Sequence, residues 1–263
     1  MADIFSVAGK VVCITGSSRG LGKAIARGFA DRGAKVVISS WNLEELEATQ
    51  REFQSQGLEV YAVEVDVSKR DRCQQLIDRT VEHYGAIDIL ICNAGIDIIR
   101  PAEQYEAEEW DKIIDINLRG YYFCAQFAAQ QMLDGREANR LRHRGAGSII
   151  MTSSIAGAVG IPGLVPYAAS KGGINQMVRT MAVEWAQKGV RVNAVAPGYI
   201  DNMMAGVEYD ENDPYQQRVT RFTPMGRRGK VEEFLGAYIF LASDAASYIT
   251  GEVLYVDGGY HAA

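Results

Sequence analysis

A tyrosine and a lysine four residues apart, in the segment Tyr167-Ala-Ala-Ser-Lys171, are candidates for acid–base chemistry. Residues at this spacing share one face of a helix, so the two side chains would lie close together. A free tyrosine has a pKa of about 10, and a neighbouring positive charge favours tyrosinate and lowers that pKa. The pair therefore predicts proton transfer to or from a substrate oxygen. Such a pair is also common on helix surfaces, so it needs support from other parts of the chain.

A glycine-rich loop near the start of the chain gives that support. The segment Thr15-Gly16-Ser17-Ser18-Arg19-Gly20-Leu21-Gly22 directly follows an apolar run and precedes a helical pattern. Glycines allow a tight turn in which backbone N–H groups approach a pyrophosphate, and the following helix N-terminus adds partial positive charge. The loop therefore predicts a dinucleotide site. Its spacing, Gly-x-x-x-Gly-x-Gly, differs from the general Gly-x-Gly-x-x-Gly fingerprint.

Elements of two kinds must position these residues. Short apolar runs rich in β-branched residues alternate with amphipathic helical stretches, which indicates βαβ units, a parallel sheet of about seven strands and a doubly wound Rossmann-type α/β fold. We expect a single domain over 1–263, because no linker or repeat interrupts the pattern. The predicted strands are 10–15, 35–39, 59–64, 87–92, 148–152, 191–196 and 253–256. The predicted helices are 22–32, 43–56, 71–84, 108–132, 167–188 and 231–243.

Two segments stand apart from this alternation. Residues 133–147 are polar and basic and are predicted to form a surface loop, to which we assign no function. Residues 200–223 mix acidic, methionine and aromatic residues after a Pro-Gly turn, and are predicted to form a mobile cap over the site. The mouth of the substrate site is expected to combine this cap with 96–100 and 155–162.

The order and spacing of these motifs resemble the short-chain dehydrogenase/reductase family, in its single-domain branch that carries TGxxxGxG and YxxxK. The resemblance covers nearly the whole chain, down to the ending Val256-Asp257-Gly258-Gly259. It implies an oxidoreductase that moves hydride between a nicotinamide dinucleotide and a carbonyl or alcohol. By resemblance, Tyr167 is the acid/base, and Lys171 lowers its pKa and holds the nicotinamide ribose.

The resemblance also implies roles for other residues. Ser154, thirteen residues before Tyr167, would hydrogen-bond the substrate oxygen; this interval selects it over Ser153. Asn117 would position a water for proton relay. Asp66 would contact the adenine, and Asn93-Ala94-Gly95 would border the cofactor. The residues expected to bind the cofactor are Gly16, Ser18, Arg19, Gly20, Leu21, Gly22, Ser40, Trp41, Asp66, Val67, Asn93, Ala94, Gly95, Tyr167, Lys171, Pro197, Gly198, Ile200 and Asn202.

One position departs from the family pattern. A threonine usually stands four residues beyond the glycine of the Pro197-Gly198 turn and touches the nicotinamide carboxamide. Here that place holds Asn202, which still offers both a donor and an acceptor.

The end of the second strand bears on the choice of cofactor. An acid there would hold the ribose 2′-hydroxyl and repel a 2′-phosphate. This chain has Ser39-Ser40-Trp41-Asn42 instead, with no acid before Glu44, and Arg19 stands beside the second glycine of the loop. NADP(H) is therefore favoured, and NAD(H) is possible.

Charge and composition bear on other classes of function and on location. The net charge of −6 gives no electrostatic footprint for nucleic acid. We read neither a signal peptide nor a membrane span, and the expectation is a cytoplasmic protein. The four cysteines form no CxxC pair or metal cluster, so no metal is predicted, and Cys13 and Cys92 lie in apolar runs as expected of core residues.

The substrate is less closely defined than the reaction. The second half of the chain resembles sugar, sugar-acid and polyol dehydrogenases such as gluconate and glucose dehydrogenases. A 3-oxoacyl-carrier-protein reductase or general carbonyl reductase is the alternative, and its acidic carrier would require a basic patch that could include Arg100, Arg227 and Arg228. A non-catalytic dinucleotide sensor and a methyltransferase are remote alternatives. Resemblance also implies a homotetramer, because relatives pair through the helices expected at 108–132 and 167–188.

Overall fold

Seven parallel strands form one sheet in the order β3-β2-β1-β4-β5-β6-β7. The computed structural model describes residues 3–137, 147–201 and 214–263. The order reverses between β1 and β4, the point at which doubly wound sheets bind ligands beyond the carboxyl ends of their strands. The predicted Rossmann-type fold is therefore confirmed. The strands are β1 (Val11–Ile14), β2 (Lys35–Ser40), β3 (Val60–Glu64), β4 (Ile89–Cys92), β5 (Gly147–Thr152), β6 (Val190–Pro197) and β7 (Val253–Val256).

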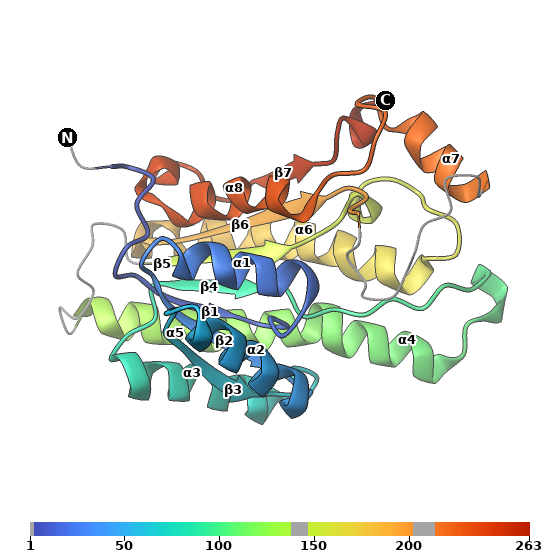
Figure 1. The fold of residues 1–263 in the computed structure, drawn as a ribbon. Coiled ribbons are helices and arrows are strands. Elements are labelled where there is room, and N and C mark those ends of the chain that lie inside the picture. Colours follow the sequence, from blue (N-terminus) through green and yellow to red (C-terminus); the bar gives the residue numbers. More distant parts are fainter. Residues whose placement is uncertain (1–2, 138–146, 202–213) are drawn as a thin grey trace.

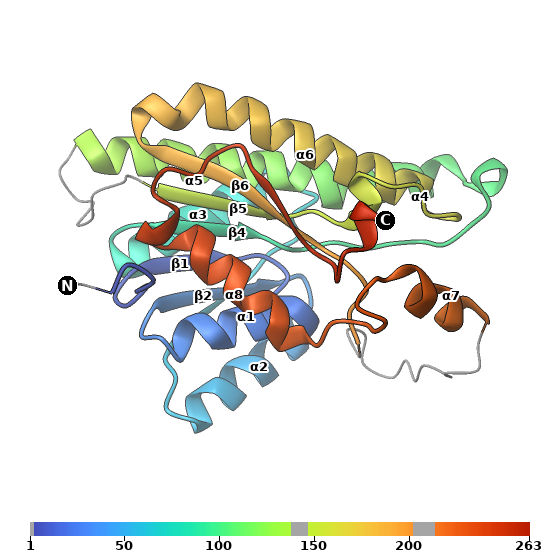
Figure 2. The same ribbon diagram turned by 90° about the horizontal axis from the view of Figure 1, so that it is seen from above.

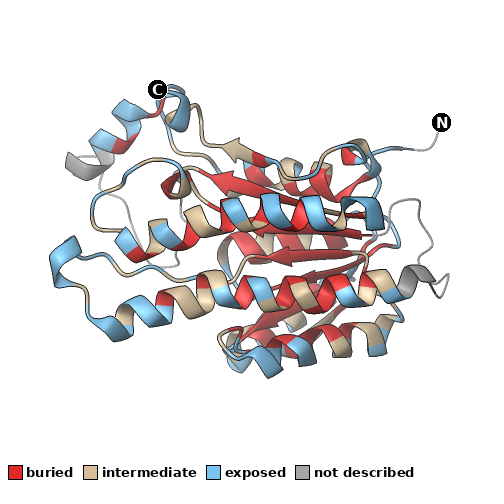
Figure 3. Ribbon diagram, turned by 180° about the vertical axis from the view of Figure 1, so that it is seen from behind, coloured by how far each residue is buried: buried red, intermediate tan, exposed pale blue. Residues whose placement is uncertain are grey.

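Helices cover both faces of the sheet (Figures 1 and 2). One face carries α1 (Gly20–Ala30), α2 (Leu43–Ser55) and α8 (Val231–Ala242). The other face carries α3 (Arg70–Tyr84), α5 (Gly120–Glu137) and α6 (Val165–Trp185). Successive residues of a strand point to opposite faces, so Cys13 packs under the α3, α5 and α6 layer whereas Val12 and Ile14 pack under α1. Figure 3 shows the resulting buried sheet between helices whose outer faces are exposed.

The long helix predicted at 108–132 is interrupted, which corrects the expectation. It consists of α4 (Ala107–Ile114), one π-helical turn at Asp115–Arg119, and α5. A hydrophobic pattern does not reveal one wide turn, because the apolar stripe continues on either side of it. Such turns occur frequently at functional sites, and this one contains Asn117.

The two unusual segments also differ from expectation. Helix α5 runs on to Glu137, so the first part of the predicted loop 133–147 is helical, and 138–146 lie outside the described residues. The predicted cap at 200–223 contains a short helix, α7 (Pro214–Phe222), which lies beyond the carboxyl ends of the strands in both views (Figures 1 and 2). Residues 202–213 lie outside the described part of the chain.

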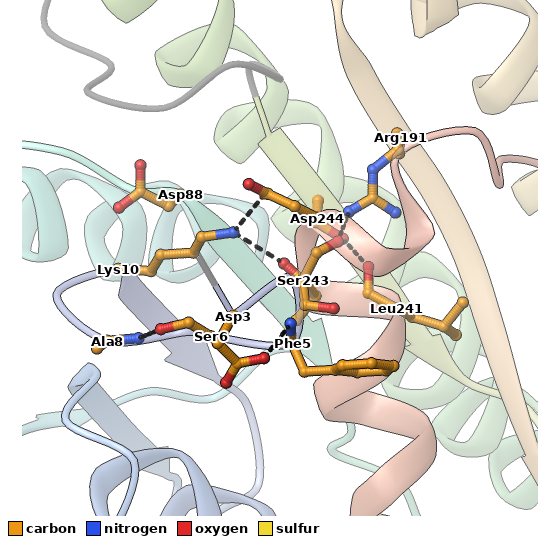
Figure 4. Close-up of polar contacts among 12 residues, drawn as sticks. Asp3, Phe5, Ser6, Ala8, Lys10, Asp88, Arg191, Leu241, Ser243 and Asp244 are labelled. Atoms are coloured by element: carbon orange, nitrogen blue, oxygen red, sulfur yellow. Dashed lines mark hydrogen bonds and ion pairs between the residues drawn. The ribbon is translucent and has the colours of Figure 1, made fainter. Parts of the chain in front are cut away.

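Polar ties hold the opposite edge of the sheet, where the strands begin (Figure 4). The buried Lys10 ammonium donates to Ala242 O and pairs with Asp244 at 3.1 Å. The Arg191 guanidinium donates to Ser243 O, and Ser148 Oγ donates to Leu241 O at 3.0 Å. These contacts fasten the end of α8 to the amino ends of β1, β6 and β5. None of the helices described is long and apolar enough to span a membrane.

Candidate active site

A threonine hydroxyl joins the loops that follow β1 and β4. Thr15 Oγ1 accepts hydrogen bonds from Asn93 N at 2.9 Å and Ala94 N at 3.0 Å. The Asn93 amide donates in return to Gly16 O at 3.0 Å. The glycine-rich loop and the Asn93-Ala94-Gly95 segment are thus bound together at the switch point of the sheet. Thr15 was absent from the predicted site, although its place before Gly16 was visible in the sequence.

The glycine-rich loop fits the pyrophosphate of a dinucleotide. Gly16 has φ +64°, a conformation that favours glycine, and a Cβ there would approach Ala94 Cα at 2.6 Å. Gly22 is buried, and a Cβ on it would collide with the Gly16 carbonyl. Helix α1 begins at Gly20 with no side-chain cap on its N-terminus and no acid in its first turn. Its first N–H groups are therefore available for an anion.

The residues at the end of β2 meet the glycine-rich loop. The Ser18 and Ser40 side chains are buried and their hydroxyls lie 3.0 Å apart. Trp41, by contrast, is 71% exposed. Glu45, from the first turn of α2, lies beside Ser18 and Arg19. The structure thus brings to this corner an acid that was not among the predicted site residues.

The loop after β3 lies at the carboxyl end of its strand, as do the loops after β1 and β2. Asp66 is exposed directly beyond the strand, and its carboxylate accepts from Ser68 N at 3.0 Å. Val67 is buried in the core. A Cβ added to Gly120 would lie 2.7 Å from the Val67 carbonyl oxygen. Leu21 is also buried, so any contact that Leu21 and Val67 make with a ligand would come from the backbone.

The first two turns of α6 carry the tyrosine and the lysine. The Lys171 ammonium lies 5.5 Å from the centre of the Tyr167 ring and 5.1 Å from that of Tyr121, and it donates to Thr152 O at 2.6 Å. Lys171 is 3% exposed. Ser154 lies beside Tyr167, and its hydroxyl lowers the pKa of the phenol. The structure therefore assembles the predicted proton-handling residues at one place.

The electrostatics of this pair differ from the expectation. Burial raises the pKa of Tyr167 to about 12, the Ser154 hydrogen bond lowers it, and the negative charge of Asp97 raises it. Burial lowers the pKa of Lys171 to about 7. The predicted lowering of the Tyr167 pKa by Lys171 is thus not found: desolvation is the largest influence on Tyr167, and it also disfavours the lysine cation. Tyr167 is held as a neutral phenol, a proton donor.

The lowered pKa of Lys171 predicts a pH dependence of stability. An unfolded lysine keeps a pKa near 10.5, so between pH 7 and 10 the unfolded chain binds a proton that the folded chain lacks. Stability then rises with pH in this window, whereas Tyr167 acts in the opposite sense only above pH 10. From pH 7 to 9, the free energy of unfolding of the native chain should rise by roughly 2 kcal/mol more than that of Lys171→Met. Urea unfolding at each pH measures both values.

A matched control for that measurement is Lys112→Met, which removes an exposed lysine from α4. Its unfolding free energy should run parallel to that of the native chain over the same pH range. Equal slopes for Lys171→Met and the native chain would contradict the assignment.

Asn117 is fully buried in the π-helical turn and binds the loop after β4. Its Oδ1 accepts from Ile96 N at 2.9 Å, and its Nδ2 donates to Ile96 O at 2.8 Å. Its side chain therefore joins the helix to the segment that follows Asn93-Ala94-Gly95. The water-positioning role stays a prediction.

The two adjacent serines have different surroundings. Ser153 is buried and donates to Asn175 Oδ1 at 2.6 Å, inside the packing of α6. Ser154 is half-buried, and its hydroxyl also accepts from Ala156 N. Of the two serines, Ser154 is the one that influences the pKa of Tyr167.

The turn after β6 lies close to the C-terminal segment. Pro197 ends the strand, and a Cβ on Gly198 would meet Asp257 Cα at 2.7 Å. Ile200 is buried and bridges to Gly229. Asn202, the residue predicted to contact the carboxamide, lies outside the described residues.

The loops expected at the substrate mouth are joined by one tyrosine. The Tyr105 hydroxyl contacts Ile98 O at 2.5 Å and Gly163 O at 2.7 Å. Arg100 pairs with Glu109 at 2.8 Å, and Asp97 is exposed near Tyr167. Sequence reasoning missed Tyr105, because nothing in the pattern says which tyrosine holds two loops together.

Two further expectations concern cysteines and metals. All four cysteines are free and buried, which confirms that Cys13 and Cys92 are core residues. Among residues 3–137, 147–201 and 214–263, no cluster of metal-ligating side chains is found.

Comparison with known proteins extends over almost the whole chain. A family model described as enoyl-(acyl carrier protein) reductase matches residues 16–261. A gluconate 5-dehydrogenase of Gluconobacter oxydans is 35% identical over 98% of this chain and 96% of its own. A 3-oxoacyl-[acyl-carrier-protein] reductase of Thermotoga maritima is 38% identical over 95% of this chain and 97% of its own.

A solved structure shares the fold closely. The gluconate 5-dehydrogenase of Burkholderia cenocepacia, in complex with NADP and tartrate, superposes with a TM-score of 0.90 at 35% identity. The match covers 99% of this chain and 98% of that one.

Proposed function

Because the chain belongs to the short-chain dehydrogenase/reductase family, we propose that it moves hydride between NADP(H) and a secondary alcohol or ketone of a sugar, sugar acid or polyol. It is an oxidoreductase acting on CH–OH groups. The observation that carries the proposal is the assembly of Tyr167, Lys171 and Ser154. Lys171 donates to Thr152 O, the Thr152 hydroxyl contacts Asn93, and Asn93 donates to Gly16 of the glycine-rich loop.

A bound nicotinamide would supply or accept the hydride, and the side chains of this chain would handle the proton and the substrate oxygen. In the reducing direction Tyr167, held as a neutral phenol, donates its proton to the substrate oxygen. Ser154 orients that oxygen by a hydrogen bond. Lys171, anchored on Thr152 O, would hold the nicotinamide ribose and would supply positive charge near the phenol when protonated. The oxidising direction requires the phenolate of Tyr167, which takes up the alcohol proton and returns to the neutral phenol that burial favours.

Residues on both sides of the switch point would hold the dinucleotide. The loop from Gly16 to Gly22 would hold the pyrophosphate, and Asp66 and Val67 the adenine. Ser18, Arg19, Ser40 and Trp41 would surround the adenosine ribose. The residues expected on the nicotinamide side are Asn93, Ala94, Gly95, Pro197, Gly198, Ile200 and Asn202. In support, a Cβ on Gly16, Gly22 or Gly198 would collide with neighbouring backbone.

Charge pairing favours a small hydroxylated substrate over one carried on an acidic protein. A docking patch would need free cations, but Arg100 pairs with Glu109 and Arg227 pairs with both Glu233 oxygens at 2.7 Å. The Arg228 guanidinium lies over the Tyr199 ring. These arginines are therefore engaged within the chain, whereas Asp97 offers an acceptor for substrate hydroxyls.

Assembly and location follow from the resemblance. We expect a homotetramer built through α4, α5 and α6, working in the cytoplasm as a single domain with its cap at 200–223. Size-exclusion chromatography with light scattering measures the assembly.

A substrate panel tests the proposed function. The purified chain is assayed with sugars, sugar acids, polyols and 3-oxoacyl thioesters, each with both cofactors, by absorbance of the reduced nicotinamide. We expect kcat/KM for a sugar acid or polyol to exceed that for every thioester, and NADP(H) to exceed NAD(H). Preference for a 3-oxoacyl thioester would replace the substrate proposal with the carrier-protein reductase alternative.

A further inference from the structure

The corner between the glycine-rich loop and β2 contains an acid that comes from a helix. Glu45 lies in the first turn of α2, five residues beyond Ser40 at the end of β2. Its Oε2 accepts from Ser18 Oγ at 3.2 Å, and its Oε1 pairs with Arg19 Nη1 at 3.4 Å. Ser18 also contacts Ser40 at 3.0 Å, so one carboxylate engages the donors of this corner.

Two side chains of α2 and its cap hold the helix, and with it Glu45, against the glycine-rich loop. Asn42 caps α2, and its side chain accepts from Glu45 N at 3.1 Å. From the next turn of α2, the buried Thr49 hydroxyl donates to Ser18 O at 2.6 Å and fixes the helix against the loop. The Glu45 side chain is 37% exposed, so solvent also reaches the carboxylate.

We propose that Glu45 is a specificity-determining residue that lowers the preference for a 2′-phosphate over a 2′-hydroxyl on the adenosine ribose. This inference rests on the proposed dinucleotide-dependent function. Ser18, Ser40 and Arg19 are donors suited to a 2′-phosphate, which carries about −1.5 to −2 charges at pH 7. Glu45 already engages two of them and adds a like charge beside the third.

The same carboxylate suits a ribose hydroxyl. A 2′-hydroxyl donates one hydrogen bond, and a carboxylate oxygen is a strong acceptor for it. An acid at the end of β2 would hold the ribose 2′-hydroxyl. In this chain Glu45, in the first turn of α2, supplies that carboxylate instead. The serines and Arg19 alone would favour NADP(H) strongly, and Glu45 reduces that preference so that both dinucleotides bind.

Binding measurements on charge variants test this role. Dissociation constants of NADP⁺ and NAD⁺ are measured by isothermal titration calorimetry for the native chain, Glu45→Gln and Glu45→Lys. We expect the preference for NADP⁺ over NAD⁺ to rise roughly tenfold in Glu45→Gln, as for loss of one like-charge contact, and further in Glu45→Lys. Salt should diminish the difference, because the corner is partly exposed.

The matched control is Glu44→Gln, which removes the same charge from the neighbouring, exposed position of the same helix turn. Its NADP⁺/NAD⁺ preference should stay within about twofold of the native chain, because long-range charge is screened in solution. An unchanged preference in both Glu45 variants, with both dinucleotides bound by the native chain, overturns the role of Glu45 alone. A native chain that binds neither dinucleotide overturns the proposed function, and the role of Glu45 with it.

Discussion

Replacing Tyr167 by phenylalanine is expected to reduce kcat by about 10²–10⁴-fold, the range of general acid–base catalysis, while dinucleotide binding is retained. Phenylalanine keeps the aromatic ring that lies 5.5 Å from the Lys171 ammonium. It lacks the hydroxyl group, which keeps its proton because burial raises its pKa. Steady-state kinetics with the best substrate of the panel, and calorimetric titration of the dinucleotide, separate the two effects.

Tyr122→Phe is the matched control for this loss. Tyr122 lies exposed on α5, and its hydroxyl accepts a hydrogen bond from the Gln126 side chain. Its kcat should stay within about twofold of the native value, as for a surface substitution. A Tyr167→Phe variant with comparable turnover would show that another group supplies the proton.

Replacing Gly22 by alanine is the second change with a large expected effect. The new Cβ would collide with the Gly16 carbonyl and lie 2.5 Å from Asn93 Nδ2, so both halves of the switch point would have to move. Overpacking of this kind lowers the free energy of unfolding by about 1–3 kcal/mol. Because the displaced groups form the pyrophosphate loop, dinucleotide affinity should fall by about tenfold, as for the loss of one hydrogen bond to the charged pyrophosphate. Urea unfolding and calorimetric titration measure the two quantities.

Gly236→Ala provides the comparison within another helix. Gly236 lies exposed in α8, and a Cβ there would meet no described heavy atom within 4 Å. Alanine should therefore raise the free energy of unfolding by about 0.5–1 kcal/mol through helix propensity, with dinucleotide affinity unchanged. If both variants bound the dinucleotide as the native chain does, close packing at Gly22 would not be what shapes the loop.

The repeating features of the fold were predictable, because they depend on local pattern. Apolar runs such as 35–39 and 148–152 coincide with strands, and buried parallel strands require such runs. The grouping of Tyr167 and Lys171 was also predictable, because four-residue spacing defines a helix face whatever the rest of the chain does.

Features that depend on tertiary contacts were not predictable. The π-helical turn contains Asn117, which binds both polar backbone groups of Ile96, a contact between segments 21 residues apart in the sequence. The raised pKa of Tyr167 comes from burial, which spacing does not report. The side chain of Glu45 turns back to Ser18, whereas the neighbouring Glu44 is exposed, and the pattern of α2 does not separate the two.

The hydrogen bonds of Lys10, Arg191 and Ser148 lie at the edge of the sheet opposite the candidate active site. Anchorage lies where the strands begin, and chemistry lies where they end. Substitutions that adapt the chain to another alcohol fall on the loops of the chemical edge and leave the anchorage intact. Substrate specificity can therefore change without loss of stability. For protein engineering, stabilising substitutions and specificity-changing substitutions can be sought independently.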